Sequence, residues 1–223
     1  MYLIFIVFKI EGISFISVPK EVLIKKFKEN LVFFVSTISI QVYINLNKII
    51  VGTFLGMKEV AIYDLGEKIT GLLKTPLMMF SQAVFPKISR EKSIAFINNT
   101  MFFITGVVVI MYLLLFFTSD EIVLYFIGTK NILAINVVLI LGSSVIFMSF
   151  GMFLGGLRLI PFGFNKEYMY VMVANGMFYL ILIGSLWLLN VINIYSITSA
   201  YVLVEAFGLA LLYYFNYKLK LLR

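Results

Sequence analysis

The stretch NTMFFITGVVVIMYLLLFFT, residues 99–118, contains no charged side chain. An α-helix rises about 1.5 Å per residue, so a helix over these residues can cross a hydrocarbon core about 30 Å thick. A run this long and this apolar predicts a membrane-spanning helix rather than a buried helix of a soluble domain.

Five further windows of the chain have a similar length and apolar character. They lie at 31–57, 60–85, 132–157, 169–189 and 194–216. The 223-residue chain is 62% hydrophobic and 13% charged, and its mean hydropathy is +1.05, whereas a soluble domain is about half apolar. We therefore predict an all-α fold, a polytopic membrane helix bundle with six transmembrane helices.

Cysteine and histidine are both absent from the chain. This excludes disulfides, thiol nucleophiles, histidine general bases and every zinc site that depends on those ligands. We expect no catalytic residue set, no metal and no cofactor.

The first 30 residues differ from the rest of the chain. The block YLIFIVF at 2–8 is too short to span a bilayer and is expected to be the end of a helix whose beginning is missing. Residues 19–29 combine apolar and basic side chains and predict a short amphipathic helix on the membrane surface. The predicted division is 1–30 for these two segments, 31–217 for the six-helix bundle and 218–223 for a basic cytoplasmic tail.

The formal net charge of +7 is unevenly distributed over the predicted loops. Alternate loops on one side carry two cations, Lys58 and Lys130, and the other side carries twelve. These twelve are Lys20, Lys25, Lys26, Lys28, Lys87, Arg90, Lys92, Arg158, Lys166, Lys218, Lys220 and Arg223. Because basic loops stay in the cytoplasm, we expect a cytoplasmic C-terminus and no nucleic-acid partner.

Polar residues recur at intervals of three or four in the first two predicted spans, which places them on one stripe of each helix. The first stripe holds Thr37, Gln41, Asn45, Lys48 and Gly52. The second holds Asp64, Glu67, Gly71, Lys74, Met78 and Ser81, with Lys68, Thr75 and Gln82 at its edge.

Two interpretations of these stripes are open. In the first, Asp64 pairs with Lys68, and Glu67 pairs with Lys48 or Lys74, as structural ion pairs. In the second, both stripes line a water-filled cavity in which Lys48 and Lys74 face an anionic solute. We prefer the cavity, because the polar positions continue past the charged ones on both helices.

Other features of the predicted spans also bear on packing or function. Glu205 is the only charge in the last span, and it is either satisfied by a lysine from another helix or is a proton or cation site. The patterns Gly52-x-x-x-Gly56 and Gly151-x-x-x-Gly155 predict close helix packing. Pro76 lies within the second span and predicts a kink.

Four motifs occur in an order that resembles a polysaccharide repeat-unit (O-antigen) flippase. They are NKIIVGTFLG at 47–56, EVAIY at 59–63, FPKIS at 85–89 (after Pro76) and GLRLIPFG at 156–163. The flippase family belongs to the multidrug/oligosaccharidyl-lipid/polysaccharide exporter superfamily, and the chain is similar to its C-terminal half only. Asn47 stands where members often carry an acidic residue, which argues against a cation site in the first span.

The resemblance implies transport without covalent chemistry, so the chain would not be an enzyme. A lipid-linked oligosaccharide on a polyprenyl pyrophosphate would cross the bacterial inner membrane by alternating access, for lipopolysaccharide and other surface polysaccharides. Lys48 and Lys74 would receive the anion, beside Asp64 and Glu67, and four side chains would bond sugar hydroxyls: Gln41, Asn45, Thr75 and Gln82. The partners would be membrane lipid and a second transporter half or a second copy.

Alternatives remain from the same and from other classes. The chain could be another transporter of the superfamily, either a cation-coupled multidrug exporter or a lipid II flippase. A drug exporter would favour an acidic cavity, whereas this chain offers Lys48 and Lys74. It could also be a membrane scaffold or an inactive remnant. A membrane glycosyltransferase or polymerase is disfavoured, because no acidic catalytic pair or large outer loop is visible.

Overall fold

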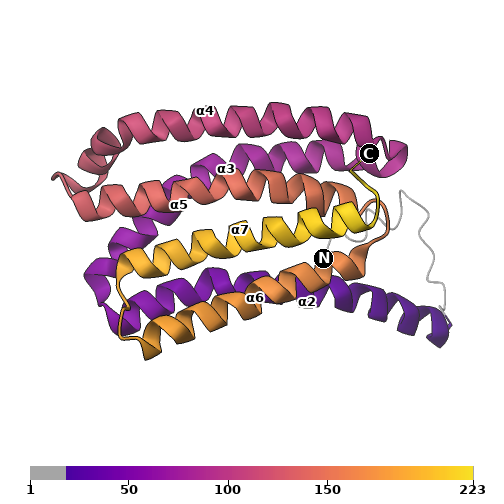
Figure 1. Ribbon diagram of the computed structural model, residues 1–223, viewed down its shortest axis with the longest axis horizontal. Helices are drawn as coiled ribbons and strands as arrows, with labels where there is room; N and C mark the ends of the chain where they lie inside the picture. Colours follow the sequence, from indigo (N-terminus) through magenta and orange to yellow (C-terminus); the bar gives the residue numbers. More distant parts are fainter. Residues whose placement is uncertain (1–18, 223) are drawn as a thin grey trace, which may run out of the picture.

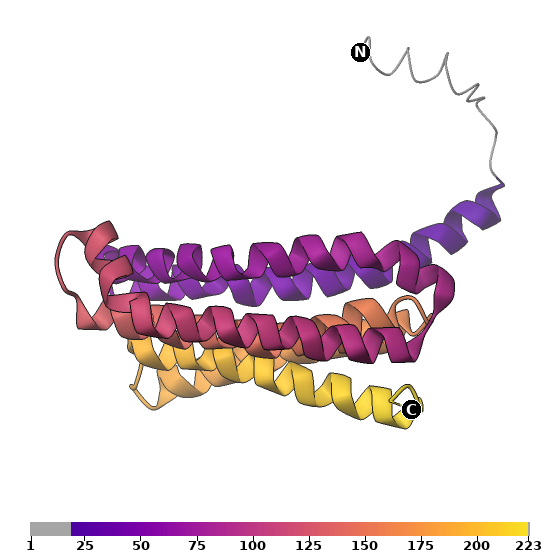
Figure 2. The same ribbon diagram turned by 90° about the horizontal axis from the view of Figure 1, so that it is seen from above.

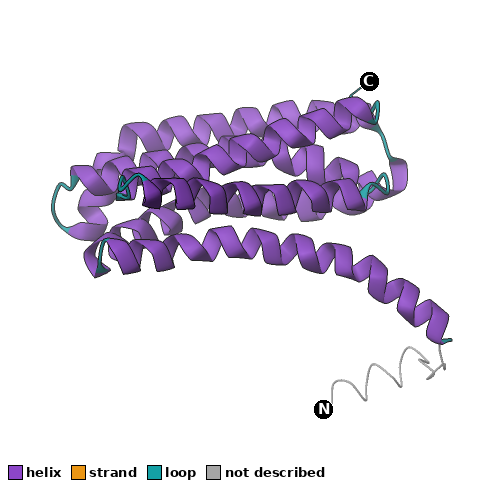
Figure 3. Cartoon of the chain, turned by 60° about the horizontal axis from the view of Figure 1, so that its bottom comes forward, coloured by secondary structure: helices purple, strands orange, loops and turns teal. Residues whose placement is uncertain are grey.

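The computed structural model describes residues 19–222, and helix is the only regular structure in that part of the chain (Figure 3). The elements, in order, are α2 (Lys20–Phe54), α3 (Met57–Glu91), α4 (Ile94–Ile127), α5 (Ile132–Gly151), the π-helix η1 (Met152–Leu159), α6 (Asn165–Leu188) and α7 (Ile194–Lys218). This confirms the all-helical prediction. The block at 2–8 lies outside the described residues.

The helices run side by side along the long axis of the molecule and are joined by short turns at its two ends (Figures 1 and 2). The end that holds the turns after α3 and η1 also holds the C-terminus of α7, and we call it the basic end because it carries Lys87, Arg90, Lys92, Lys166, Lys218 and Lys220. The opposite end holds Lys58 and Lys130.

Helix α5 occupies the middle of the bundle. It packs against α3, α4 and α7, while α6 packs against α2 and α7. The buried face of α5 is made of small and branched side chains, among them Val137, Val138 and Leu141. Gly142 allows α4 to approach closely, since a Cβ atom there would lie 2.9 Å from a methyl carbon of Leu115.

Turn chemistry explains where the helices begin and end. The side chains of Ser93 and Asn131 cap α4 and α5, and Asn193 forms a reciprocal capping box with Ser196 at the start of α7. Gly56, with φ 112°, stands between α2 and α3 in a conformation that side chains rarely adopt. These residues fix the short turns that make the bundle antiparallel.

Five of the helical segments are long and apolar enough to span a membrane. They are Asn30–Phe54, Ile94–Ile127, Ile132–Leu159, Asn165–Leu188 and Ile194–Lys218. The window predicted at 60–85 became α3, a 35-residue helix of matching length that is not among these five apolar segments. It runs alongside α5 within the bundle (Figure 1), and its charged side chains are half-buried or exposed.

The predicted surface helix at 19–29 is not separate. Helix α2 runs without a break from Lys20 to Phe54, so the predicted boundary at residue 30 falls inside it. Its first turns extend past the neighbouring helices (Figures 1 and 2). The physical reason is that nothing in this segment breaks a helix, since Pro19 lies just before the first helical residue, where proline is tolerated.

The small-residue pattern at Gly151 and Gly155 marks close packing, as predicted. A Cβ atom on Gly155 would lie 2.9 Å from a ring carbon of Tyr168 and 3.2 Å from a methyl carbon of Leu212. The Gly151 and Gly155 pattern therefore marks a close contact among η1, α6 and α7.

The proline at position 76 lies inside α3, which remains one continuous helix.

Candidate functional site

Four charged side chains meet where α2 faces α3. The Nζ atom of Lys48 lies 2.8 Å from Oδ1 of Asp64 and 2.7 Å from Oε2 of Glu67. The second carboxylate oxygen of Asp64 lies 2.7 Å from Nζ of Lys68, one helical turn away. The cluster contains two cations and two anions, so it is neutral as a whole.

This geometry resolves the pairing that the sequence left open. Glu67 pairs with Lys48, and the Asp64–Lys68 pair is the predicted i,i+4 contact. Lys48 is bound by two carboxylates at once, so it presents less free positive charge than Lys74 does. The side chains are 26–75% exposed in the isolated chain. The strength of their attraction therefore depends on whether water, or lipid or another protein, surrounds them.

A second group of polar side chains lies deeper between α2, α3 and α7. Lys74 donates a hydrogen bond to the hydroxyl of Tyr201 at 3.0 Å. The hydroxyl of Tyr43 donates to Oε1 of Glu205 at 3.3 Å. Glu205 interacts electrostatically with both Lys74 and Tyr201. A lysine from another helix therefore does approach the lone carboxylate, through a tyrosine hydroxyl that lies beside both.

Tyr43 is the centre of an aromatic group that continues toward α6. Its ring centroid lies 6.2 Å from that of Tyr179 and 6.1 Å from that of Tyr201. The Tyr179 hydroxyl donates to Oδ1 of Asn47 at 2.7 Å, and the Asn47 amide donates to the backbone carbonyl of Tyr43 at 2.9 Å. Asn47 is fully buried and hydrogen-bonded, as a structural residue of the α2–α6 contact.

A cavity of about 170 Å³ lies between the two groups. Its wall is formed by Ile44 from α2, by Tyr63, Glu67, Thr70 and Lys74 from α3, by Leu141 from α5 and by Tyr201 from α7. The Lys74 ammonium has three N–H donors, of which Tyr201 accepts one. The cavity therefore has one ammonium and one ion-paired carboxylate on its wall, among apolar and aromatic side chains.

The four side chains expected to bond sugars do not line this cavity. Asn45 donates to the backbone oxygen and the side-chain oxygen of Gln41 at 2.8 and 3.0 Å, and both residues are exposed. Thr75 donates to the carbonyl of Gly71 at 2.8 Å, and Gln82 is exposed. Their assignment to substrate binding stays a prediction, and it requires a surface that α2 and α3 present outside this cavity.

Sequence reasoning missed the tyrosines of the site. Tyr43, Tyr179 and Tyr201 lie within the apolar windows of the sequence, although each hydroxyl is hydrogen-bonded within the bundle. One pattern could have found two of them. Tyr43 stands four residues before Asn47, and Tyr201 stands four residues before Glu205, so each tyrosine shares a helix face with a polar side chain.

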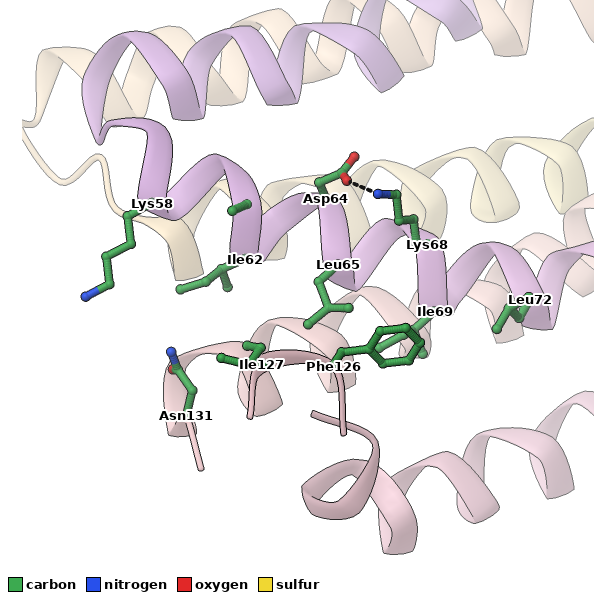
Figure 4. A pocket seen from close by; sticks show the side chains of 11 residues that line it. Lys58, Ile62, Asp64, Leu65, Lys68, Ile69, Leu72, Phe126, Ile127 and Asn131 are labelled. Atoms are coloured by element: carbon green, nitrogen blue, oxygen red, sulfur yellow. Dashed lines mark ion pairs between the residues drawn. The ribbon is translucent and has the colours of Figure 1, made fainter. Parts of the chain in front are cut away.

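A larger groove of about 790 Å³ opens on the other face of α3, near the Lys58 end. Its floor is apolar, with Ile62, Leu65 and Ile69 facing Phe126 and Ile127. The Asp64–Lys68 ion pair lies on its far side, across from Phe126 (Figure 4). Asp64 is thus shared between this groove and the Lys48 cluster.

No curated protein and no solved structure is similar enough to be matched. The match that was found is to a family, and it covers the segment that contains α2, α3 and the whole Lys48 cluster. Residues 1–92 match the family described as polysaccharide biosynthesis protein.

Proposed function

We propose that the chain is one bundle of a flippase. It moves polyprenyl-pyrophosphate-linked oligosaccharide repeat units across the bacterial inner membrane for surface polysaccharide biosynthesis, including the O-antigen of lipopolysaccharide. The observation that carries the proposal is the cavity inside the bundle that has the Lys74 ammonium and the Glu67 carboxylate on its wall, beside Tyr201. The match of residues 1–92 to a polysaccharide biosynthesis family supports the same substrate class.

The physical argument is one of desolvation. A pyrophosphate with sugars attached cannot enter hydrocarbon, because an unpaired charge there costs at least about 3 kcal/mol on insertion scales. A transporter must therefore offer polar and cationic groups at the depth of the membrane. Lys74 is the side chain best placed for this, since Lys48 is already bound by Asp64 and Glu67. The process breaks no covalent bond and needs no enzyme chemistry.

The size of the cavity argues for a partner. Its volume of about 170 Å³ is below the range of about 300–1,000 Å³ that is usual for small-molecule sites, and an oligosaccharide is larger than most small molecules. The substrate site must therefore be completed by a second bundle that rocks against this one. We propose that a separate transporter half, or a second copy of this chain, supplies it.

Glu205 gives the proposed transporter a group that could couple it to an ion. It is a carboxylate within a membrane helix and has tyrosine and lysine neighbours. Loss or gain of a proton there changes the charge beside Lys74 and Tyr201, and so changes how strongly this wall of the cavity attracts a pyrophosphate. We propose that Glu205 binds the coupling proton or cation. We also propose that the C-terminus lies in the cytoplasm.

The proposal is tested by deleting the gene in a cell that makes a repeat-unit surface polysaccharide. The expected result is loss of the surface polymer, with lipid-linked repeat units accumulating on the cytoplasmic leaflet. In vivo crosslinking is expected to trap a second half or a second copy. Normal surface polymer in the deletion strain, or restoration of export by a chain that crosslinking shows to be monomeric, would contradict it.

A further inference from the structure

The basic end of the bundle contains a buried arginine that has no carboxylate beside it among the described residues. Arg158, in the π-helix η1, is fully buried, with a relative exposure of 0%. Its Nη2 atom donates to Oδ1 of Asn98 on α4, while Nε and Nη1 meet no acceptor in the described part of the chain. A buried charge is normally paired, so this guanidinium calls for an anion close to it.

Asn98 connects Arg158 to a groove on the outside of the bundle. The groove has a volume of about 690 Å³ and lies between α4 and α7, over the end of α5. Its walls are almost entirely apolar, and Asn98 is the polar side chain among residues such as Met101, Leu154 and Leu209. Because its oxygen accepts from Arg158, the amide N–H groups of Asn98 remain as donors at the groove wall.

Two lysines stand at the mouth of the same groove. Tyr213 and Leu222 line both the groove and an adjoining pocket of about 450 Å³, whose other residues are Tyr217, Lys218 and Lys220. Both lysines are exposed at the end of α7. The groove therefore leads from an apolar interior to a cluster of cations, with Asn98 on its wall and the buried Arg158 behind Asn98.

The dimensions match one leaflet of a bilayer. Ala206 is the groove residue on α7 that lies farthest from Lys218. The two residues are twelve positions apart, which corresponds to about 18 Å along the helix. Half of a bilayer core is about 15 Å. Phe102 and Tyr213, which are 66% and 57% exposed, face outward at its edges, so the groove opens toward lipid rather than toward the central cavity.

We propose that this groove is a binding site for an anionic diacyl phospholipid. One acyl chain lies between α4 and α7, and the phosphate accepts hydrogen bonds from Asn98 and lies beside the ammonium groups of Lys218 and Lys220. The bulk phospholipid is the occupant, since the groove faces the lipid phase and its mouth lies at headgroup level. This proposed phospholipid site does not depend on which substrate the central cavity binds.

The test uses native mass spectrometry on the purified full chain, with any subunit that co-purifies. Phosphatidylglycerol and phosphatidylcholine with identical acyl chains are the probes. We expect phosphatidylglycerol to bind about tenfold more tightly, because basic side chains at the surface favour anionic headgroups. The double variant Lys218→Gln/Lys220→Gln should lose most of this preference. The matched control, Arg90→Gln/Lys166→Gln, removes two exposed cations from the same end outside the groove and should keep it.

A charge placed on the groove wall makes the test sharper. Asn98→Asp supplies Arg158 with a carboxylate and so should leave thermal stability equal or higher, while it lowers phosphatidylglycerol binding at least fivefold and leaves phosphatidylcholine unchanged. Equal binding of the two lipids by the unaltered chain would overturn the proposal. So would displacement of phosphatidylglycerol by equimolar polyprenyl phosphate, because the occupant would then be the carrier lipid.

Discussion

The ammonium of Lys74 on α3 lies 3.0 Å from the hydroxyl of Tyr201 on α7, although 127 positions separate the two residues in sequence. Tyr201 interacts with Glu205, which in turn accepts a hydrogen bond from Tyr43 on α2. One polar network therefore joins three helices around the central cavity. Protonation or deprotonation of Glu205 therefore changes its electrostatic interactions with the Tyr43, Tyr201 and Lys74 side chains that join these helices.

The Tyr179–Asn47 hydrogen bond should be the main polar contribution to the contact between α2 and α6. Both residues are fully buried, so Tyr179→Phe leaves the Asn47 oxygen without a donor and should cost about 1–3 kcal/mol. Thermal unfolding in detergent measures the change. The control is Tyr195→Phe, which removes an exposed hydroxyl bonded to Asn136 at 3.3 Å; an equal effect of the two variants would argue against a buried structural role.

Gly155 and Gly156 form a matched pair within η1. Gly155→Ala drives a methyl group into Tyr168 and Leu212 and should destabilise the chain by about 1–3 kcal/mol. Gly156→Ala meets nothing within 4 Å in the described structure and should be close to neutral. The same unfolding measurement compares them. Equal tolerance of both substitutions would mean that η1 does not pack tightly against α6 and α7.

The Lys48 cluster should behave as a structural ion pair. Lys48→Met leaves Glu67 without the cation that it contacts at 2.7 Å, whereas Asp64 keeps Lys68. The expected loss is about 1–2 kcal/mol, less than the 3–5 kcal/mol of a fully buried pair, because the Lys48 side chain is 40% exposed. Adding Glu67→Gln should restore the abundance of the protein in the membrane. Failure of the second change to rescue the first would exclude this pairing as the cause.

The basic end predicts the direction of insertion, with the C-terminus in the cytoplasm. The chain has no cysteine, so Lys58→Cys and Lys92→Cys each introduce a single thiol at opposite ends of α3, about 50 Å apart. An impermeant reagent applied outside intact cells should label position 58 and spare position 92. The reverse pattern would place the C-terminus outside and overturn the cytoplasmic assignment.

How much of this structure the sequence predicts depends on how far apart in sequence the contacting residues lie. Apolar windows and the Asp64–Lys68 pair are local, so spacing along one helix reveals them. The partner of Lys74 is not local, because it depends on which helices become neighbours. The sequence therefore left Glu67 and Lys74 as possible partners, whereas the fold brings Lys74 to Tyr201.

The grooves and η1 could not be predicted either. The residues of the groove between α4 and α7 come from segments up to 124 positions apart, Asn98 to Leu222, and the side chains between them carry no pattern of their own. The Gly151 and Gly155 spacing indicated close packing but gave no sign that the helix changes to a π-helix at Met152. A π-helix arises from packing against neighbours as well as from local preference, so its position becomes visible only in the fold.

The most direct test of the proposed function is the export of repeat units in a cell whose chromosomal copy carries Lys74→Met. The double variant Lys74→Met/Glu205→Gln is measured beside it, because removing both charges leaves no unpaired carboxylate to destabilise the fold. Glu205→Gln alone is measured as well, because Glu205 is itself proposed to bind the coupling ion. We predict that the double variant is as abundant as the unaltered protein, that surface polysaccharide falls at least tenfold in both Lys74 variants, and that lipid-linked repeat units accumulate on the cytoplasmic leaflet. Normal abundance together with normal surface polysaccharide in the double variant would contradict a role for Lys74 in receiving the substrate.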